Sequence, residues 1–300
     1  MHRKTEPQRL LLEASWRHCG VTSMMRHLRT RQRESVRWLR SIVVNRVRAN
    51  DPGPKILANS IPKAGTHLLT RCLALMPGLA DSGLRLRGRV HDHDLEARLR
   101  LVGGGCFMPA HVYYTEQREQ ILSGLGFRIV LIIRDPRDVV VSHYHYVTYG
   151  SRRHQLRDYY RSLPDDGARL MMSITGIQEP HSDAAIRLRD IDSRYRSFLA
   201  WANHGACVVR FEHMVGPRGG GSHETQRMEI RKIAEHLGVQ LEEKDIQHIA
   251  TNMFHRGSTT FRKGIIGDWK RHLTPEHQVA FRSIAGQLLA DLGYEPDQDW

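Results

Sequence analysis

The sequence predicts a single α/β domain with a central parallel sheet flanked by helices. Short apolar segments rich in β-branched residues, of which Arg128–Ile133 (RIVLII) is the clearest, alternate with segments of helical periodicity. Strands separated by helices pair in parallel, because a parallel pair needs a long crossover connection. Polar and basic loops directly follow several of these strands, and parallel sheets bind ligands beyond the carboxyl ends of their strands. The length of 300 residues suits one such domain.

Each expected strand is a short apolar run bounded by polar or turn-forming residues. The expected strands are Ile56–Ser60, Cys106–His111, Arg128–Ile133 and Cys207–Phe211. Helical segments are expected from the end of a loop at Pro62–His67 to Met76, over Asp138–Val147, and over most of the chain after Glu224. Loops are expected at Gly216–Ser222 and His255–Asp268.

The net charge of +13 is concentrated at the N-terminus. Residues 1–50 hold twelve Lys or Arg and three Glu, a net charge of +9, whereas the other 250 residues carry only +4. A strongly basic chain implies an anionic partner, such as nucleic acid, a membrane surface or a phosphate-rich small molecule. Because the body is nearly balanced in charge, we do not expect nucleic acid as a partner. We divide the chain into a basic helical extension, residues 1–50, and a domain, residues 51–300.

Within the extension, Val36, Leu39, Val43 and Val47 recur at helical spacing among arginines. Two interpretations of this basic amphipathic helix stay open. In the first, the helix packs on the domain and leaves a solvated basic face. In the second, it makes a peripheral contact with an anionic membrane or an acidic partner. The sequence Asp51-Pro-Gly-Pro ends the helix.

Cysteine usage and hydropathy indicate a cytoplasmic protein. The four cysteines are widely spaced, without a Cys-x-x-Cys pair or a Cys/His cluster of zinc spacing, so we expect neither disulfides nor a metal site. No stretch approaches 18 apolar residues, and the start of the sequence lacks an apolar region of signal-peptide length.

The first chemically informative segment is the loop IPKAGTH, which joins the strand at Ile56–Ser60 to the next helix. Backbone N–H groups at a helix start are unpaired and bind phosphate well. Gly65 permits close approach of the backbone, Lys63 supplies a point charge, and Thr66 and His67 add donors. The lysine precedes the glycine, so this is not the Walker A pattern of ATP-hydrolysing P-loops.

The second segment, RDPRDVVVS, follows the RIVLII strand. Arg134 ends a buried strand, where a charged group needs a partner. Together with Ser142 on the next helix, it suits a second phosphate, which arginine binds bidentately. We expect Asp135 and Asp138 to cap the start of that helix rather than to act in catalysis.

The third segment is FRKGIIGDWK, residues 261–270. Arg262 and Lys263 precede Gly264 in a loop that is otherwise apolar, an arrangement that a solvated surface does not need. An anion site formed by folding of this loop over a nucleotide explains it better.

In order and spacing, the three segments resemble those of the sulfotransferases that use 3′-phosphoadenosine 5′-phosphosulfate (PAPS), in particular the cytosolic type. The resemblance covers roughly Lys55 to Asp297. It implies transfer of a sulfuryl group from PAPS to a hydroxyl or amine acceptor by a single α/β domain with a P-loop-like element. It also implies that PAPS is the co-substrate and that no metal is needed.

The resemblance also implies three groups of PAPS ligands. The loop that binds the 5′-phosphosulfate comprises Pro62, Lys63, Ala64, Gly65, Thr66 and His67. The ligands of the 3′-phosphate are Arg134, Ser142, Arg262, Lys263 and Gly264. The adenine region differs from the family pattern, because Leu68 replaces a Trp and Phe211 replaces a Tyr found in many members. We therefore expect Phe211 and Phe261 to contact the adenine.

Two residues are implied to be catalytic. His111 falls where the family has its general base, between a short strand and the RIVLII strand. An imidazole has an ordinary pKa of about 6.5, which suits proton removal from an alcohol near neutral pH. Lys63 would meet the negative charge that develops on the departing phosphate.

Three alternatives to an active sulfotransferase stay open. A kinase or NTPase is disfavoured because neither the Walker Lys-Ser/Thr nor an acidic magnesium site is recognisable. A nucleic-acid-binding module is disfavoured by the charge balance of residues 51–300. An inactive PAPS-binding protein is disfavoured because His111 and Lys63 are both present.

The acceptor is left open among small molecules, lipids and carbohydrates. Several tyrosines favour an apolar or sugar-like acceptor, namely Tyr113, Tyr146, Tyr149, Tyr159 and Tyr160. Several arginines in the same region favour an anionic one, namely Arg152, Arg153, Arg157 and Arg161.

Overall fold

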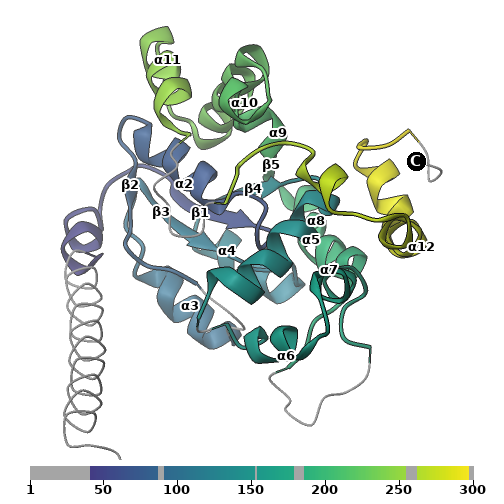
Figure 1. Cartoon of the computed structure of the whole chain (residues 1–300). Helices are drawn as coiled ribbons and strands as arrows, with labels where there is room; N and C mark the ends of the chain where they lie inside the picture. Colours follow the sequence, from purple (N-terminus) through teal and green to yellow (C-terminus); the bar gives the residue numbers. More distant parts are fainter. Residues whose placement is uncertain (1–40, 87–90, 153, 179–185, 255–261, 297–300) are drawn as a thin grey trace, which may run out of the picture.

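The computed structural model describes residues 41–86, 91–152, 154–178, 186–254 and 262–296. Five strands form one parallel sheet in the order β2-β3-β1-β4-β5 (Figure 1). They are β1 (Lys55–Ser60), β2 (Ala80–Asp81), β3 (Cys106–Ala110), β4 (Phe127–Ile133) and β5 (Cys207–Arg210). The predicted fold class and four strands are confirmed. The two-residue strand β2 was not predicted, because so short a run has no periodicity to recognise.

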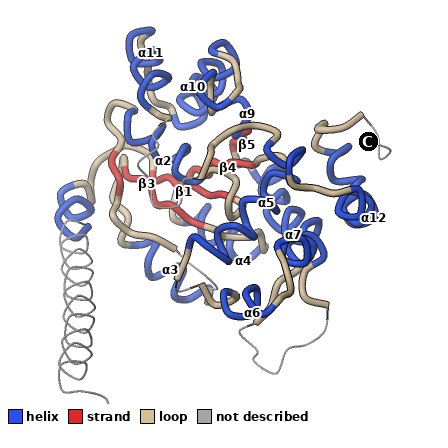
Figure 2. Tube along the Cα trace, in the orientation of Figure 1, coloured by secondary structure: helices blue, strands red, loops and turns tan. Residues whose placement is uncertain are grey.

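The sheet separates two hydrophobic clusters, and alternation along the strands explains why. In β4, Ile129, Leu131 and Ile133 enter one cluster, whereas Val130 and Ile132 enter the other. Figure 2 shows the strands in red between the two helical layers. One layer comprises α2 (Thr66–Leu75), α10 (His223–Leu237) and α11 (Glu243–Asn252). The other layer comprises α3 (Asp92–Arg100), α4 (Glu116–Gly124), α5 (Pro136–His145), α6 (Arg157–Ser162), α7 (Asp166–Thr175), α8 (Ile191–Leu199) and α12 (Pro275–Asp291).

Some element boundaries differ from the predicted ones. Strand β5 ends at Arg210, and Phe211 begins the short helix α9 (Phe211–Met214). Helix α5 begins at Pro136 and ends at His145, after which Tyr146–Gly150 forms a π-helical turn. Short 3₁₀ helices occur at Ala200–His204, Pro217–Gly219 and Asp268–Arg271. Of the loop predicted at His255–Asp268, residues 255–261 lie outside the described part, and residues 262–267 form a loop.

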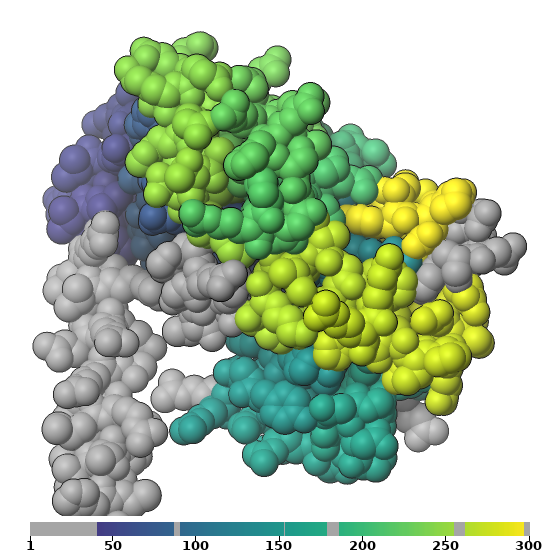
Figure 3. Space-filling view, turned by 45° about the horizontal axis from the view of Figure 1, so that its top comes forward, coloured from purple at the N-terminus to yellow at the C-terminus, as the bar shows by residue number. Residues whose placement is uncertain are grey.

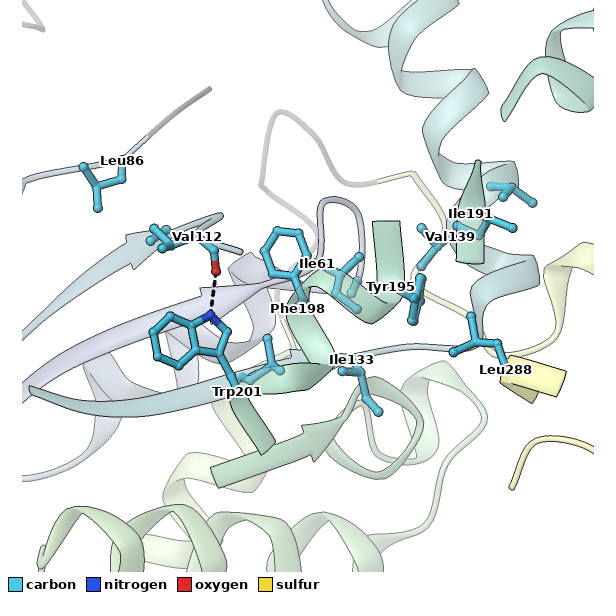
Figure 4. Close-up of a cluster of buried hydrophobic side chains, with 14 of the residues drawn as sticks. Ile61, Leu86, Val112, Ile133, Val139, Ile191, Tyr195, Phe198, Trp201 and Leu288 are labelled. Carbon is cyan, nitrogen blue, oxygen red and sulfur yellow. Dashed lines mark hydrogen bonds between the residues drawn. The ribbon is translucent and has the colours of Figure 1, made fainter. Parts of the chain in front are cut away.

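The larger hydrophobic cluster fixes the backbone beyond β3. Trp201 is fully buried in it, and its indole Nε1 donates a hydrogen bond to the carbonyl oxygen of Val112 at 2.9 Å (Figure 4). Val112 follows His111, so the core holds the segment that presents this histidine.

The strand order places the functional loops together. Strand β1 lies between β3 and β4. The helix that follows β1, α2, covers one face of the sheet, whereas the helices that follow β3 and β4, α4 and α5, cover the other. Parallel sheets bind ligands at such a switch point. The loop after β1, His111 after β3 and Arg134 after β4 all emerge at this edge. In the described part of the chain, no helix has the length and apolar character needed to span a membrane.

Candidate functional site

The loop between β1 and α2 has a backbone that only particular residues adopt. Gly65 has a φ of 118°, and a Cβ added there would lie 2.8 Å from Cδ2 of Phe211. Both the left-handed backbone and the close ring require glycine. Lys63 has a φ of 75°, the one positive value at a non-glycine position in the described residues. Such strain clusters at functional sites, because the surrounding structure must hold it in place.

The start of α2 is therefore open to an anionic ligand. Its N-cap residue is Gly65, which has no side chain to accept from the first N–H groups, and the first turn has no acidic residue. The helix dipole adds positive potential at this end. Thr66 lies partly exposed at the helix start and His67 is exposed, whereas Ala64 and Leu68 are buried beneath the loop.

His111 is joined to this loop through Ser60. The Nδ1 atom of His111 lies 2.8 Å from the carbonyl oxygen of Ser60 and 3.2 Å from its hydroxyl. A carbonyl oxygen only accepts, so Nδ1 must carry the proton and the lone pair of the neutral ring lies on Nε2. The Ser60 hydroxyl is also 2.6 Å from Oγ1 of Thr66. The strand end, the helix start and the histidine thus form one connected unit.

Asn59 holds the other side of this unit. Its side chain is fully buried and forms a two-way pair with Val112: Nδ2 donates to the Val112 carbonyl at 2.8 Å, and Oδ1 accepts from the Val112 N–H at 2.9 Å. The amide thereby continues the pairing of β1 with β3 past the last register pair, Asn59 with Ala110. The position of His111 is consequently fixed by the hydrogen bond of its ring to Ser60 and by the hydrogen bonds between Asn59 and the next residue, Val112.

Lys63 projects into a cationic environment. Its Nζ lies 3.9 Å from the centre of the Tyr146 ring, a cation–π contact. Burial, and secondarily the positive charges of Arg134 and Arg262, lower the pKa of Lys63 to about 8. The cations therefore repel one another in this state, and an anionic ligand among them would relieve the repulsion.

Arg134 ties the second predicted segment to the third. Its Nη2 donates to Oδ2 of Asp138 at 3.0 Å and to the Ile265 carbonyl oxygen at 2.7 Å. Its guanidinium lies 4.3 Å from the centre of the Phe211 ring. The Nε atom of Arg134 is buried and has no hydrogen-bond partner within the described residues. An unpaired buried donor of this kind suits an anionic ligand.

The two aspartates after β4 have different roles. Asp135 is the N-cap of α5 and accepts from the N–H of Arg137 at 2.9 Å, as expected. The capping prediction for Asp138 is wrong. Its carboxylate accepts from the N–H groups of Gly267 and Trp269, at 3.0 and 2.9 Å, and so anchors the loop of the third segment. This contact spans more than 120 residues of chain, so the local sequence gave no indication of it.

The third segment lies against the second, and its two cations pair with a carboxylate of the same segment, Asp268. Lys263 Nζ is 2.8 Å from Oδ1 of Asp268, and Arg262 pairs with the other oxygen of the same carboxylate. Burial alone would raise the pKa of Asp268, but the hydrogen bonds from Lys263 and Arg262 lower it to about 2. His272 Nε2 is 3.3 Å from Asp268 as well. Figure 3 shows the yellow-green segment after residue 262 between the green α10–α11 region and the teal helices.

The other predicted ligands have distinct positions. Ser142 is partly buried on α5, and Phe211 is buried against Gly65 and Arg134. Gly264 has a left-handed φ of 63°. Phe261 lies outside the described residues.

Among the aromatic residues proposed for the acceptor region, Tyr160 is a core residue. It is fully buried, and its hydroxyl lies 2.9 Å from the Ser173 hydroxyl. Tyr146 contacts Lys63, whereas Tyr113 and Tyr149 are exposed. Arg153 lies outside the described residues.

Sequence reasoning missed Asn59, Ser60, Asp138 and Asp268 as parts of this site. The first two carried a recognisable signal, because two polar side chains at the carboxyl end of a buried parallel strand need partners. Asp138 depends on a contact between segments distant in sequence, whereas Asp268 pairs with Arg262 and Lys263 of its own segment. Within the described ranges, no group of three or more His, Cys, Asp or Glu side chains is arranged to hold a metal ion.

Comparison with known proteins agrees with the resemblance seen in the sequence. No family model matches the chain. Cytosolic sulfotransferase 6 of Arabidopsis thaliana is 24% identical over 210 residues, covering 62% of this chain and 56% of the relative. The chain spans about half the length of the curated relatives that it matches.

Solved structures show the same fold. The mouse sulfotransferase SULT7A1 complexed with PAP superposes with a TM-score of 0.57 at 18% identity, covering 80% of this chain and 87% of the other. Retinol dehydratase in a complex with retinol and PAP superposes with a TM-score of 0.50 at 15% identity, covering 81% and 84%. At these identities the similarity demonstrates the shared sulfotransferase fold.

Proposed function

We propose that this chain, which is similar to cytosolic sulfotransferases in sequence and shares the fold of sulfotransferases, transfers the sulfuryl group of PAPS to the hydroxyl or amine of an acceptor. The observation that carries the proposal is the convergence of Lys63, Arg134 and Arg262 at the switch point of the sheet, next to a histidine of fixed tautomer. PAPS supplies the activated sulfuryl group and leaves as the bisphosphate PAP.

The residues present fit such a co-substrate. Lys63 and the open start of α2 suit the 5′-phosphosulfate, for which Gly65 leaves the backbone accessible. Arg134 has a buried Nε without a partner among the described residues, and Ser142, Arg262, Lys263 and Gly264 follow the family pattern for the 3′-phosphate. Binding of that phosphate would compete with Asp268 for Arg262 and Lys263. The adenine is assigned to the region of Leu68, Phe211 and Phe261.

In this proposal His111 is the general base. Its Nδ1–H is held by the Ser60 carbonyl, so Nε2 is the atom that takes the proton from the acceptor hydroxyl. The imidazolium that forms keeps its Nδ1–H hydrogen bond, which stabilises the charge. Asn59 acts through Val112 as a positioning residue for this step.

Lys63 has the complementary role. As a protonated amine it meets the negative charge that grows on the bridging oxygen of the departing phosphate. A low pKa in the ligand-free protein does not oppose this role, because an anion beside the amine favours its charged form.

The acceptor class remains a small molecule, lipid or carbohydrate. Retinol in the complex with retinol dehydratase is one example of a small-molecule alcohol bound by a protein of this fold. In the present chain, Tyr146 contacts Nζ of Lys63, and on this contact we assign the acceptor to the neighbourhood of the Tyr146–Gly150 turn.

Thermal stabilisation by ligands tests the proposal. PAP, AMP and ATP are compared without magnesium, and ATP is also measured with it. Ligand at a hundredfold its Kd adds about 2.7 kcal/mol to the free energy of unfolding. We expect stabilisation by PAP alone, and its loss in Arg134→Ala and Lys263→Ala. Stabilisation by ATP with magnesium but not by PAP would replace the proposal with a nucleotide-dependent kinase or NTPase.

A further inference from the structure

The helix that contains residues 41–47 packs on the domain through buried polar side chains, beside which Val44 contacts the larger hydrophobic cluster. Residues 41–47 are helical and lie beside the edge strand β2 (Figure 1). Ser41 and Asn45 are 3% and 8% exposed. Asn45 donates to the Ser82 carbonyl at 2.8 Å and accepts from the Gly103 N–H at 3.1 Å, while Arg48 donates to the Gly78 carbonyl. These bonds fix how the helix is rotated about its axis.

This rotation turns the apolar stripe of the helix away from the domain. Ile42, Val43 and Val47 are 40%, 60% and 79% exposed. The interpretation in which the predicted stripe packs on the domain is therefore wrong for Val43 and Val47; Val36 and Leu39 lie outside the described residues. A helix that binds through Asn45 and exposes three large aliphatic side chains has an unused apolar face.

The charge around this face indicates what covers it. Residues 24–48 contain eight arginines and one acidic residue, Glu34. Arg46 is exposed next to Val47. Aliphatic side chains flanked by arginines match the interface of an anionic bilayer, where apolar groups enter the headgroup region and arginines pair with lipid phosphates.

A second copy of the chain fits this face less well. A coiled coil needs apolar residues to recur every seven positions. Seven residues before Val36 and after Val43 stand Arg29 and Asn50, and seven residues before and after Leu39 stand Gln32 and Arg46. The repeat fails in both directions, and a symmetric dimer would bring like charges together.

We infer that the exposed face formed by Ile42, Val43 and Val47 docks the protein on an anionic lipid surface. The docking face lies at the β2 edge of the sheet, whereas the candidate site is built from the ends of β1, β3 and β4. Docking therefore leaves the site accessible to acceptors at the membrane surface. This inference does not depend on the proposed sulfotransferase activity.

Co-sedimentation of the full chain with vesicles tests the inference. Phosphatidylcholine vesicles are compared with vesicles that also contain phosphatidylserine, at low and high salt. We expect binding to the anionic vesicles only, weakened by salt. The double variant Val43→Asp, Val47→Asp should bind at least about tenfold less tightly, because two buried aliphatic contacts are replaced by repulsive charges.

The double variant Met228→Asp, Val279→Asp is the matched control, because these residues are each 59% exposed on α10 and α12 and their replacement changes the net charge by the same amount outside the helix. It should bind as the unmodified chain does, and all variants should keep their melting temperature. The inference is overturned if anionic vesicles are not bound, or if the double variant binds them equally well. Sedimentation velocity adds a third outcome: a dimer that the double variant converts to a monomer would identify a second copy as the occupant and also refute the inference.

Discussion

The Nδ1 atom of His111 lies 2.8 Å from the carbonyl oxygen of Ser60, the last residue of β1. This bond joins the segment after β3 to the end of the central strand β1, where the loop that contains Lys63 begins. It fixes the tautomer of a histidine that the sequence had indicated only by its position. If His111 is the base, His111→Ala should lower kcat by a factor of about 10² to 10⁴ while PAP binding persists. Sulfuryl transfer and PAP-dependent melting, measured on the same preparation, check this; undiminished turnover would exclude His111 as the base.

Asn59 is expected to support the same proton transfer indirectly, because it bonds Val112, the residue that follows His111. Asn59→Ala removes both hydrogen bonds to Val112 and leaves its buried N–H without an acceptor, whereas the Val112 carbonyl keeps its bond from Trp201. We expect a cost of about 1–3 kcal/mol in the free energy of unfolding. The matched control is Trp201→Phe, which removes the indole bond to the same Val112 carbonyl but leaves the amide pair intact. We expect kcat to fall more in Asn59→Ala than in the control. Equal losses of kcat would show that Asn59 contributes stability alone.

The activity should decline as the pH rises through about 8. The pKa of Lys63 is lowered to about 8, so the amine loses its proton above that pH and can no longer offset charge on the leaving group. The pH dependence of kcat/KM reports this ionisation in the free enzyme. Lys63→Arg should move the decline to higher pH even if kcat falls, because a guanidinium stays protonated. An unchanged decline in that variant would assign the ionisation to another group.

Gly65 is expected to tolerate no side chain. In Gly65→Ala, the left-handed backbone costs about 1–2 kcal/mol, and the collision of Cβ with Phe211 adds to it. Gly78 is the matched control, since its φ of 76° imposes the same kind of strain while nothing lies within 4 Å of an added Cβ. Chemical denaturation should show a larger loss for Gly65→Ala than for Gly78→Ala, and only the former should lose PAP binding. Equal effects would mean that Phe211 moves aside without consequence.

Asp138 should be among the most costly charged side chains to remove. Asp138→Ala leaves the buried Arg134 without its carboxylate and two backbone N–H groups without an acceptor, at a cost of about 3–5 kcal/mol in the free energy of unfolding. The comparison variant is Asp192→Ala, which breaks the solvent-exposed pair with Arg196 and should cost about 1 kcal/mol or less. Urea denaturation of both variants decides whether the anchoring role assigned to Asp138 is correct.

Much of the fold was readable because the determining signals are local. The strands β1, β3, β4 and β5 are short apolar runs, and the glycines and prolines around them mark turns, so alternation with helices implied a parallel sheet. The loop with Lys63 and Gly65, the Arg134 segment and the Arg262–Lys263 pair were likewise visible as charges placed at the ends of elements. The boundary errors at Phe211 and His145 arose because periodicity does not locate the last residue of an element.

The sequence by itself determined the fold class, the order of the three segments and the kinds of groups available for binding an anion. Only the tertiary structure decided which of those groups meet. Asp138 anchors a loop about 130 residues away, Arg134 bonds the Ile265 carbonyl oxygen of the same loop, and Asn59 supports His111 through Val112. The outward rotation of Val43 was likewise decided by the bonds of Asn45 to Ser82 and Gly103. Such contacts depend on where the packed sheet brings distant segments, which periodicity and local propensity do not encode.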